Sequence, residues 1–242
     1  MKFEYGEGDV MPVRINVVRG DITVFEADAI VNSANRSLHK GSGLCKAIYE
    51  KAGEAELTTA LQDYGELAVG AAIITSGFKL KAKHIIHTVT PKYLPIKEKN
   101  PCLLAQCYVS ILNLAIQNKL ESMAIPCLGV GHHMWPLELA AGIALDTILW
   151  NRVKLASMEN LSIVCFTNEQ YDMYSQYLQK DRWLVMYEAQ PKKMLIINIL
   201  EILRKYSDHN HRLSQKDILD MLWRDYAMKV DRKAIKRNIT NL

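Results

Sequence analysis

The chain has 242 residues, of which 49% are hydrophobic and 23% are charged. This composition is typical of folded globular proteins and argues against intrinsic disorder, and the length fits one or two domains. The first ten residues lack the apolar run of a secretory signal, and no stretch approaches the roughly 18 consecutive apolar residues of a membrane helix. We therefore expect a cytoplasmic protein that makes no membrane contact.

Charge and cysteine content add two constraints. From Pro191 onward, twelve Lys and Arg residues face six Asp and Glu residues, so the last part of the chain is strongly basic while the rest is nearly neutral. A basic domain favours a polyanionic partner. The five cysteines form no CxxC pair, and four of them lie in apolar runs, which is typical of buried, reduced thiols.

Short apolar segments rich in Ile and Val alternate with helical patterns over the first 180 residues. The alternation predicts an α/β domain of three layers, in which helices cover a largely parallel sheet. Ligand sites in such sheets gather in the loops beyond the carboxyl ends of the strands. We expect strands at 13–18, 29–32, 71–75, 84–89, 122–127 and 161–166, and helices at 43–52, 101–119, 136–152 and 169–179.

Three loops that follow expected strands carry residues suited to a nucleotide. Asp21 follows the first strand, where a carboxylate can accept a hydrogen bond from an exocyclic amine, although an Asp after Gly is more often a turn or cap residue. Segment 31–45 is rich in Asn and Gly and runs into a helix, whose N-terminal N–H groups attract phosphate. Segment 126–136 repeats this strand–glycine–helix order, so the two loops together would suit a diphosphate.

The motifs GDIT, DAIVNSAN, a glycine loop before GLCKAIYEKAG, HIIHTVTP and IPCLGVG follow the order and spacing of the macrodomain family, which the chain resembles from about Val13 to Leu178. The family binds ADP-ribose, and some members hydrolyse ADP-ribosyl esters or related acyl derivatives. The resemblance implies a central mixed, largely parallel sheet of six or seven strands. It also implies ADP-ribose, or an ADP-ribosylated protein or nucleic acid, as the partner, and we expect no cofactor.

The resemblance further implies which residues contact the ligand. Asp21 would bind the adenine amine, with the Ile22 amide near the ring edge, and Phe166 would pack against the ring. Asn35 would hold the distal ribose. The backbone of the two glycine loops would line the two sides of the diphosphate. The remaining residues that the resemblance assigns to the ligand site lie in or beside these loops: Asn32, Gly43, Leu44, Cys45, Gly129, Val130, Gly131, His132 and His133.

One departure from the family pattern bears on catalysis. Hydrolytic macrodomains usually end the first glycine loop with Gly-Val-Asp, but here the loop ends with Cys45, and a largely protonated thiol is a poor substitute for a carboxylate that orients water. His133 stands where the family often has an aromatic residue, and an imidazole can either stack there or act as a base. The favoured interpretation is a site that binds without hydrolysis. The alternatives are a hydrolase that uses Asn35 with His133, and a module that docks an ADP-ribosylated partner.

Metal binding is not expected. His39, Cys45, His132 and His133 are residue types that suit zinc, but their spacing matches no recognised ligand pattern.

The first domain is expected to span 1–186, and residues 187–191 are expected to link it to a domain of three helices at 192–242. A capping box at Ser214 to Asp217 should open the second helix, and Asp231 should cap the third. This region resembles the N-terminal winged-helix segment of bacterial transcription regulators, with a helix-turn-helix unit, although the β-hairpin wing expected next is missing. DNA contacts are assigned to the exposed face of the third helix, and protein contact is the alternative: Arg232, Lys233, Lys236, Arg237 and Asn238.

Overall fold

The computed structural model describes residues 13–94, 100–155 and 157–179, followed by 199, 202, 203, 207, 213–226, 233, 235 and 236. The chain divides into two compact units, Met1–Gln179 and Lys180–Leu242. Because the expected linker at 187–191 lies outside the described residues, it stays a prediction. No helix among these residues is long and apolar enough to span a bilayer.

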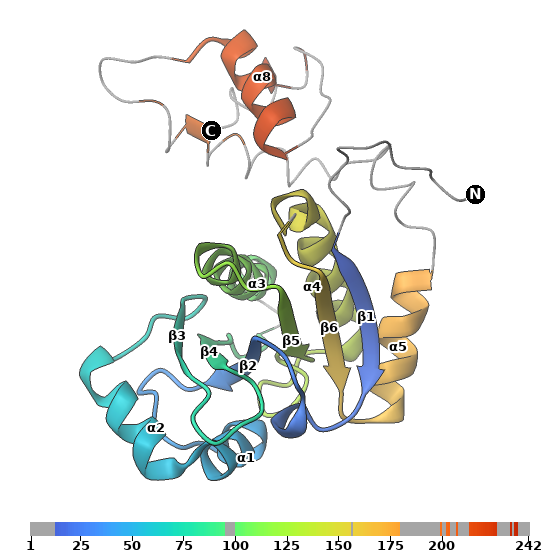
Figure 1. Cartoon of the computed structure of the whole chain (residues 1–242). Coiled ribbons are helices and arrows are strands. Elements are labelled where there is room, and N and C mark those ends of the chain that lie inside the picture. Colours follow the sequence, from blue (N-terminus) through green and yellow to red (C-terminus); the bar gives the residue numbers. More distant parts are fainter. Residues whose placement is uncertain are drawn as a thin grey trace. The chain divides into compact units, whose positions relative to one another are not determined.

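The first unit is built on one mixed sheet of six strands in the order β1-β6-β5-β2-β4-β3 (Figure 1). Only β3 runs antiparallel to its neighbour, and the other pairs are parallel. All six expected strands are present, each within two residues of the expected bounds. The strands are β1 Arg14–Arg19, β2 Ala29–Ala34, β3 Ala72–Ser76, β4 His84–Val89, β5 Ser122–Pro126 and β6 Asn160–Cys165.

Helices cover both faces of the sheet, which gives the three layers that the sequence predicts. Alternate residues of β2 show how this works: Ala29 and Val31 join the core beneath α3, α4 and α5, while Ile30 and Ala34 join the core beneath α1 and α2. The helices are α1 Gly43–Ala52, α2 Glu54–Leu61, α3 Asn100–Gln117, α4 Leu137–Asn151 and α5 Asn168–Gln179.

Helix α2 is the element that sequence reasoning missed. Gly53 ends α1 with a φ of 101°, a value that suits glycine, and its N–H donates to the carbonyl of Tyr49. The carbonyl of the same glycine then accepts from the N–H of Leu57 inside the next helix. Leu57 and Leu61 bury one side of α2. With only eight residues, α2 was too short for its apolar period to be recognised next to α1.

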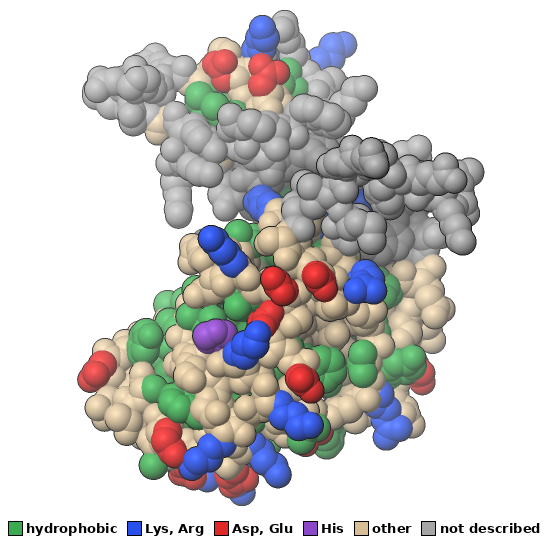
Figure 2. All heavy atoms as spheres, in the orientation of Figure 1, with side chains coloured by type: hydrophobic (Ala, Val, Ile, Leu, Met, Phe, Trp, Pro, Cys, Tyr) green, Lys and Arg blue, Asp and Glu red, His purple; other side chains and the backbone are tan. Residues whose placement is uncertain are grey.

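Charged side chains of both signs are interspersed over the face of the first unit that is drawn in Figure 2. This agrees with the nearly neutral composition of this part of the chain.

In the second unit, the predicted capping box is present at the start of α8, Gln215–Tyr226. The N–H of Ser214 donates to Oδ2 of Asp217 at 2.7 Å, and the N–H of Asp217 donates to Oγ of Ser214 at 3.2 Å. Ile218 and Leu222 are buried, as their spacing indicates. Residues 199, 202, 203, 233, 235 and 236 are helical, but the turn of the expected helix-turn-helix and Asp231 lie outside the described residues. The winged-helix arrangement therefore stays a prediction.

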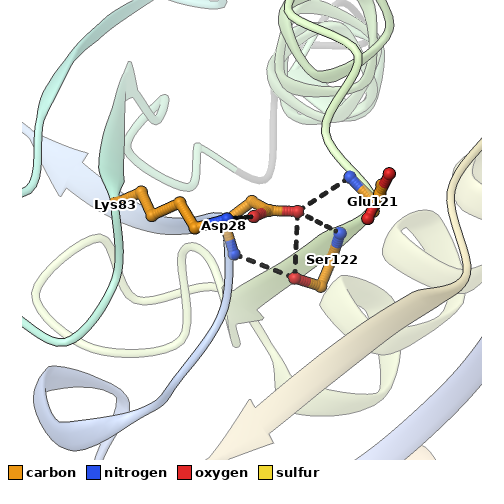
Figure 3. Close-up of polar contacts among 4 residues, drawn as sticks. All are labelled: Asp28, Lys83, Glu121 and Ser122. Atoms are coloured by element: carbon orange, nitrogen blue, oxygen red, sulfur yellow. Dashed lines mark hydrogen bonds and ion pairs between the residues drawn. The ribbon is translucent and has the colours of Figure 1, made fainter.

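The amino-terminal ends of three central strands are joined by one carboxylate, that of Asp28 (Figure 3). Its Oδ2 accepts from the backbone N–H groups of Glu121 and Ser122, both at 2.9 Å, where β5 begins. Its Oδ1 lies 2.7 Å from Nζ of Lys83, which precedes β4. The Ser122 hydroxyl oxygen in turn accepts from the N–H of Asp28, which precedes β2. These bonds align β2 with both of its neighbours.

Replacing Asp28 should destabilise the first unit. In Asp28→Ala, two backbone N–H groups lose their acceptor, and we expect a loss of roughly 2–4 kcal/mol in the free energy of unfolding. Urea unfolding followed by circular dichroism measures this loss, and hydrogen exchange at the Glu121 and Ser122 amides should accelerate. Lys83→Met is the control, because Lys83 is 74% exposed and its ion pair should contribute little. Equal losses in the two variants would contradict this assignment.

The same group gives the unit a pH dependence. Burial alone would raise the pKa of Asp28, but the hydrogen bonds from Lys83, Glu121 and Ser122 together lower it below its ordinary value of 3.8. The charged Asp28 carboxylate therefore makes its full contribution to the free energy of unfolding above pH 3.8. This contribution is lost as the pH falls through the lower pKa that Asp28 has in the folded state.

Candidate functional site

The candidate site lies at the carboxyl edge of the sheet. Strands β1, β6, β5, β2 and β4 are parallel, so the loops that follow them all leave the sheet at the same edge (Figure 1). The two glycine loops follow β2 and β5, which are direct neighbours in the sheet. Apart from Asn32, which lies within β2, the ligand-contacting residues expected in the first unit lie in the loops at this edge or at the strand and helix ends beside them.

Asp21 is the N-cap of a short 3₁₀ helix, η1 (Ile22–Val24). Its Oδ1 accepts from both the backbone N–H of Thr23 at 2.9 Å and the Thr23 hydroxyl at 2.8 Å. Asp21 is therefore a cap residue, which is the alternative that the sequence left open for it. Because the cap uses a single carboxylate oxygen, Oδ2 is still able to accept a bond from an adenine amine. The adenine contact stays a prediction.

Phe166 lies beside this cap because the N–H of Gly20 donates to the carbonyl of Cys165, the residue before it, at 2.9 Å. The Phe166 side chain is 76% exposed, and its backbone N–H donates to Oε1 of Gln170 at 2.9 Å. An exposed aromatic ring next to a carboxylate offers a stacking surface with an acceptor at its side. The Ile22 side chain is buried, so this residue would contribute its backbone to a ligand.

Asn35 closes the turn that follows β2. Its Oδ1 accepts from the Ser37 hydroxyl at 2.9 Å and from the N–H of His39 at 3.1 Å, and its Nδ2 donates to the carbonyl of His39 at 2.8 Å. Since a primary amide has two N–H bonds, one remains for a ribose hydroxyl. A Cβ built at Gly41 would lie 3.4 Å from both Nδ2 of Asn35 and Sγ of Cys45, which places these two side chains close together.

Asn32 is fully buried in β2 beneath this loop, in a polar chain that sequence reasoning did not foresee. Its Nδ2 lies 3.1 Å from Nδ1 of His87 and 3.8 Å from Sγ of Cys45, and Nε2 of His87 lies 3.0 Å from the Thr75 hydroxyl. Burial lowers the pKa of His87 to about 4, so this imidazole is neutral near pH 7. Asn32 thus supports the Cys45 loop from below, and its predicted ligand contact stays a prediction.

Helix α1 begins at the carboxyl edge of the sheet, directly after the first glycine loop. Gly43 has a φ of 53°, and a Cβ built there would meet nothing within 4 Å. The first N–H groups of an α-helix have no partner within the helix, so Gly43, Leu44 and Cys45 offer donors to an anion. The Cys45 thiol itself is buried and lies 3.9 Å from the carbonyl of His39. It contacts the backbone of His39, and the described residues contain no three His, Cys, Asp or Glu side chains placed to share a metal ion.

The glycine loop after β5 is held by Trp135. A Cβ at Gly129 would lie 2.6 Å from Cδ1 of Trp135, and the φ of 86° also requires glycine there. The indole Nε1–H donates to the carbonyl of Pro91 at 2.8 Å, which ties this loop to the one after β4. Gly131 differs, because a Cβ built there meets nothing within 4 Å and its φ is ordinary. Gly131 therefore faces open space on a rigid loop.

His133 is half-buried, and its Nδ1 lies 3.3 Å from the Thr90 hydroxyl, which is 2.8 Å from the Ser33 hydroxyl of β2. Burial lowers the pKa of His133, and the nearby charges of His132 and Lys92 lower it further. The two histidine rings meet edge-on with centroids 6.3 Å apart. His133 is thus linked through Thr90 to the strand that leads to Asn35, and a neutral imidazole there is able to accept a proton.

A cavity of about 240 Å³ lies on the outer side of the Asn35 turn. Its walls come from Ser37, Leu38 and His39 and from the segment between Thr58 and Glu66. Sequence reasoning could not find it, because part of its wall, Thr58 and Leu61, belongs to α2.

Of the five residues assigned to DNA, Lys233 and Lys236 are described, and both are exposed. Arg232, Arg237 and Asn238 lie outside the described residues, and DNA binding stays a prediction.

Comparison with known proteins gives consistent matches over the first unit. The family model of the Macro domain matches residues 31–144. A Macro domain-containing protein of Lactiplantibacillus plantarum is 39% identical over 164 residues, which are 67% of this chain and 95% of that protein. An O-acetyl-ADP-ribose deacetylase of Citrobacter rodentium is 40% identical over 172 residues, covering 69% of this chain and 97% of that protein.

Solved structures agree with these matches. The Oceanobacillus iheyensis macrodomain with ADP has a TM-score of 0.64 and 36% identity, covering 72% of this chain and 96% of that one. The Trypanosoma brucei macrodomain in complex with ADP-ribose has a TM-score of 0.61 and 32% identity, with 68% of each chain covered.

The environment of His133 generates a measurable prediction. Its imidazole should titrate below its ordinary value of 6.5, because the charged form is desolvated and repelled. Stability linked to this group is therefore complete above pH 6.5 and falls as the pH drops toward the folded-state pKa. NMR titration of the histidine ring protons, with His133→Gln used for assignment, measures the value. A His133 pKa at or above 6.5 would contradict the burial that the structure shows.

Proposed function

The chain belongs to the macro domain family, and on this premise we propose that its first unit binds ADP-ribose, either free or attached to a protein or nucleic acid. The observation that carries the proposal is the pair of glycine loops after the neighbouring strands β2 and β5. Gly43 and Gly131 are exposed on these loops, and a Cβ at either position would meet nothing within 4 Å. A diphosphate between the loops could therefore approach the main chain of both.

The remaining parts of the ligand have matching groups along the same edge. Adenine would stack on Phe166 and donate its amine to the free oxygen of Asp21, at the β1 and β6 end of the edge. The distal ribose would lie at the β2 end, where the Asn35 amide keeps one N–H bond. This order, with adenine at one end, ribose at the other and phosphates between, follows the order of the strands in the sheet.

Hydrolysis of an ADP-ribosyl ester is the second candidate function, favoured by the 36–40% identity to proteins named O-acetyl-ADP-ribose deacetylase. The chemistry of Cys45 opposes it, because the thiol is buried and its neighbours are Asn32 and a backbone carbonyl. His133 supports it, because a lowered pKa keeps the imidazole neutral and able to accept a proton from water. We rank binding first, because it does not require a carboxylate at position 45 to orient a water molecule.

The binding proposal is tested by adding a side chain at the proposed diphosphate site without straining the fold. Gly131→Val should reduce affinity for ADP-ribose by more than roughly tenfold, because a side chain at Gly131 meets no protein atom within 4 Å at its Cβ and would occupy the space proposed for the diphosphate. Calorimetric titration of the full chain measures affinity, with ADP and AMP as ligand controls, and we expect AMP to bind much more weakly.

Gly142→Ala is the matched control, because Gly142 lies within α4 and its Cβ would make only ordinary contacts with Tyr177 of α5. Its affinity and the thermal stability of both variants should stay close to those of the parent chain. Undiminished binding by Gly131→Val would reject this placement of the diphosphate. No binding of ADP-ribose by the parent chain would reject the function.

The ranking of binding above hydrolysis has its own test. We expect the parent chain, Cys45→Ala and His133→Ala all to leave O-acetyl-ADP-ribose intact, as measured by acetate release. Turnover that survives Cys45→Ala and falls by roughly a hundredfold or more in His133→Ala would overturn the ranking and identify His133 as the base.

A further inference from the structure

Two cysteines lie side by side at the edge of the sheet that carries the candidate site. Cys165 is the last residue of β6, and Cys127 is the first residue after β5. The residues before them, Pro126 and Val164, are paired partners in these parallel strands. The two thiols lie on the same side of the sheet, with their Sγ atoms 3.6 Å apart.

We propose that Cys127 and Cys165 are the site of a reversible disulfide bond whose formation weakens ligand binding by the loops that begin at this edge. The disulfide itself is independent of the ligand, whereas its effect on binding rests on the function proposed above.

The backbone geometry brings the pair within the range of a disulfide. Neighbouring strands of a sheet are about 4.8 Å apart, and disulfides join Cα atoms roughly 4.4–6.8 Å apart. The sulfur atoms must close from 3.6 Å to about 2.05 Å. Since the hydrogen bonds of the sheet hold both strands, the sulfurs must approach within a stiff frame. Disulfides formed under such strain are the readily reduced, regulatory ones.

The surroundings of the pair determine where oxidation starts. Cys165 is fully buried, whereas Cys127 is partly exposed, so an oxidant reaches Cys127 first. Tyr108 from α3 and Tyr174 from α5 are fully buried and interact electrostatically with Cys127, which encloses the pair on the helical side. The hydrogen bond that Cys127 donates to Cys165 lowers the pKa of Cys165 and raises that of Cys127, so Cys165 is the first of the two thiols to lose its proton.

A peroxide is the class of oxidant that the reaction needs. After Cys165 has lost its proton to solvent, Cys127 transfers its own proton to Cys165 across the hydrogen bond between them. The Cys127 thiolate formed in this way attacks one peroxide oxygen and the O–O bond breaks. Cys127 becomes a sulfenic acid, and the hydroxide that leaves takes up a proton from solvent. The Cys165 sulfur then attacks the Cys127 sulfur and loses its proton, and the S–O bond breaks with release of water. Overall, two thiols lose two hydrogen atoms, and one hydrogen peroxide becomes two waters. A dithiol reductant reverses the step.

Both sulfurs are attached to chain segments that the proposed ligand would contact. Cys127 leads into Leu128 and Gly129, and Gly129 cannot adjust independently because the Trp135 ring fills the space beside it. On the other strand, the carbonyl of Cys165 holds the N–H of Gly20 just before Asp21. Drawing the sulfurs together therefore shifts the glycine loop toward β6 and narrows the space for the diphosphate.

The experiment uses the full chain. The chain is reduced, separated from the reductant under anaerobic conditions and treated with hydrogen peroxide, and the remaining thiols are then alkylated. We expect the number of free thiols to fall from five to three and a peptide map to show Cys127 linked to Cys165. Calorimetry should give an affinity for ADP-ribose roughly tenfold weaker after oxidation, restored by a dithiol.

Cys102→Ser is the matched control, because it removes an exposed thiol on α3 that the proposal does not involve. It should keep the link and the loss of affinity, whereas Cys127→Ala should lose both responses to peroxide. The peptide map of the oxidised parent chain tests the disulfide even if Cys127→Ala folds poorly, because that map requires no variant.

An oxidised parent chain without the linked peptide would overturn the proposal, as would a linked chain whose affinity stays within twofold of the reduced value. If the reduced chain binds no ADP-ribose, the proposed function fails and takes the effect on binding with it. The linked peptide is still read from the map, so the disulfide stands or falls separately.

Discussion

The architecture of the first unit depends on parallel register. Asp28 joins the beginnings of β2, β4 and β5, and this fixes where the same strands end. A slip of one residue would turn the Asn32 side chain from one face of the sheet to the other and break its contacts with His87 and Cys45. The Asp28 carboxylate is remote from the candidate site, because it lies at the amino-terminal ends of the strands and the site lies at their carboxyl ends. Its contribution to function is positional: it determines which loop residues meet at the carboxyl edge.

Much of this could be predicted from sequence because the signals were local. Ile- and Val-rich runs marked all six strands, and the loops after them held the polar and glycine residues that a nucleotide would need. Other features required three dimensions. Helix α2 is too short for its apolar pattern to be recognised, and the cavity beside Leu38, which α2 helps to form, could not be predicted without it. The neighbours of Asn32, the approach of Cys127 to Cys165, and the use of Asn35 in its own turn all join residues whose proximity no spacing rule encodes. In the second unit, the Ser214–Asp217 box was predictable because its bonds span three residues.

The two departures from the family pattern have different physical meanings. At position 45, the change replaces a charged, water-orienting group with a thiol that packs against Asn32 and the His39 backbone, so it fills space and donates weakly. At position 133, an imidazole kept neutral by its surroundings preserves both an aromatic surface and a proton acceptor. Recognition by main-chain N–H groups is unaffected by either change, because it depends on loop shape. If the proposed function holds, such a site would keep its ligand while its chemistry changes.

Trp135 has a further consequence. Its indole is 97% shielded, packs against Gly129, stacks at a tilt on Tyr93 with 5.1 Å between ring centroids, and donates to Pro91. One fluorophore therefore stands between the loops after β4 and β5, in contact with backbone that any movement of the glycine loop must displace. The emission of an indole depends on its hydration and on its hydrogen bond, so Trp135, one of four tryptophans in the chain, is an optical reporter behind the second glycine loop. Events there should be visible in real time without a label.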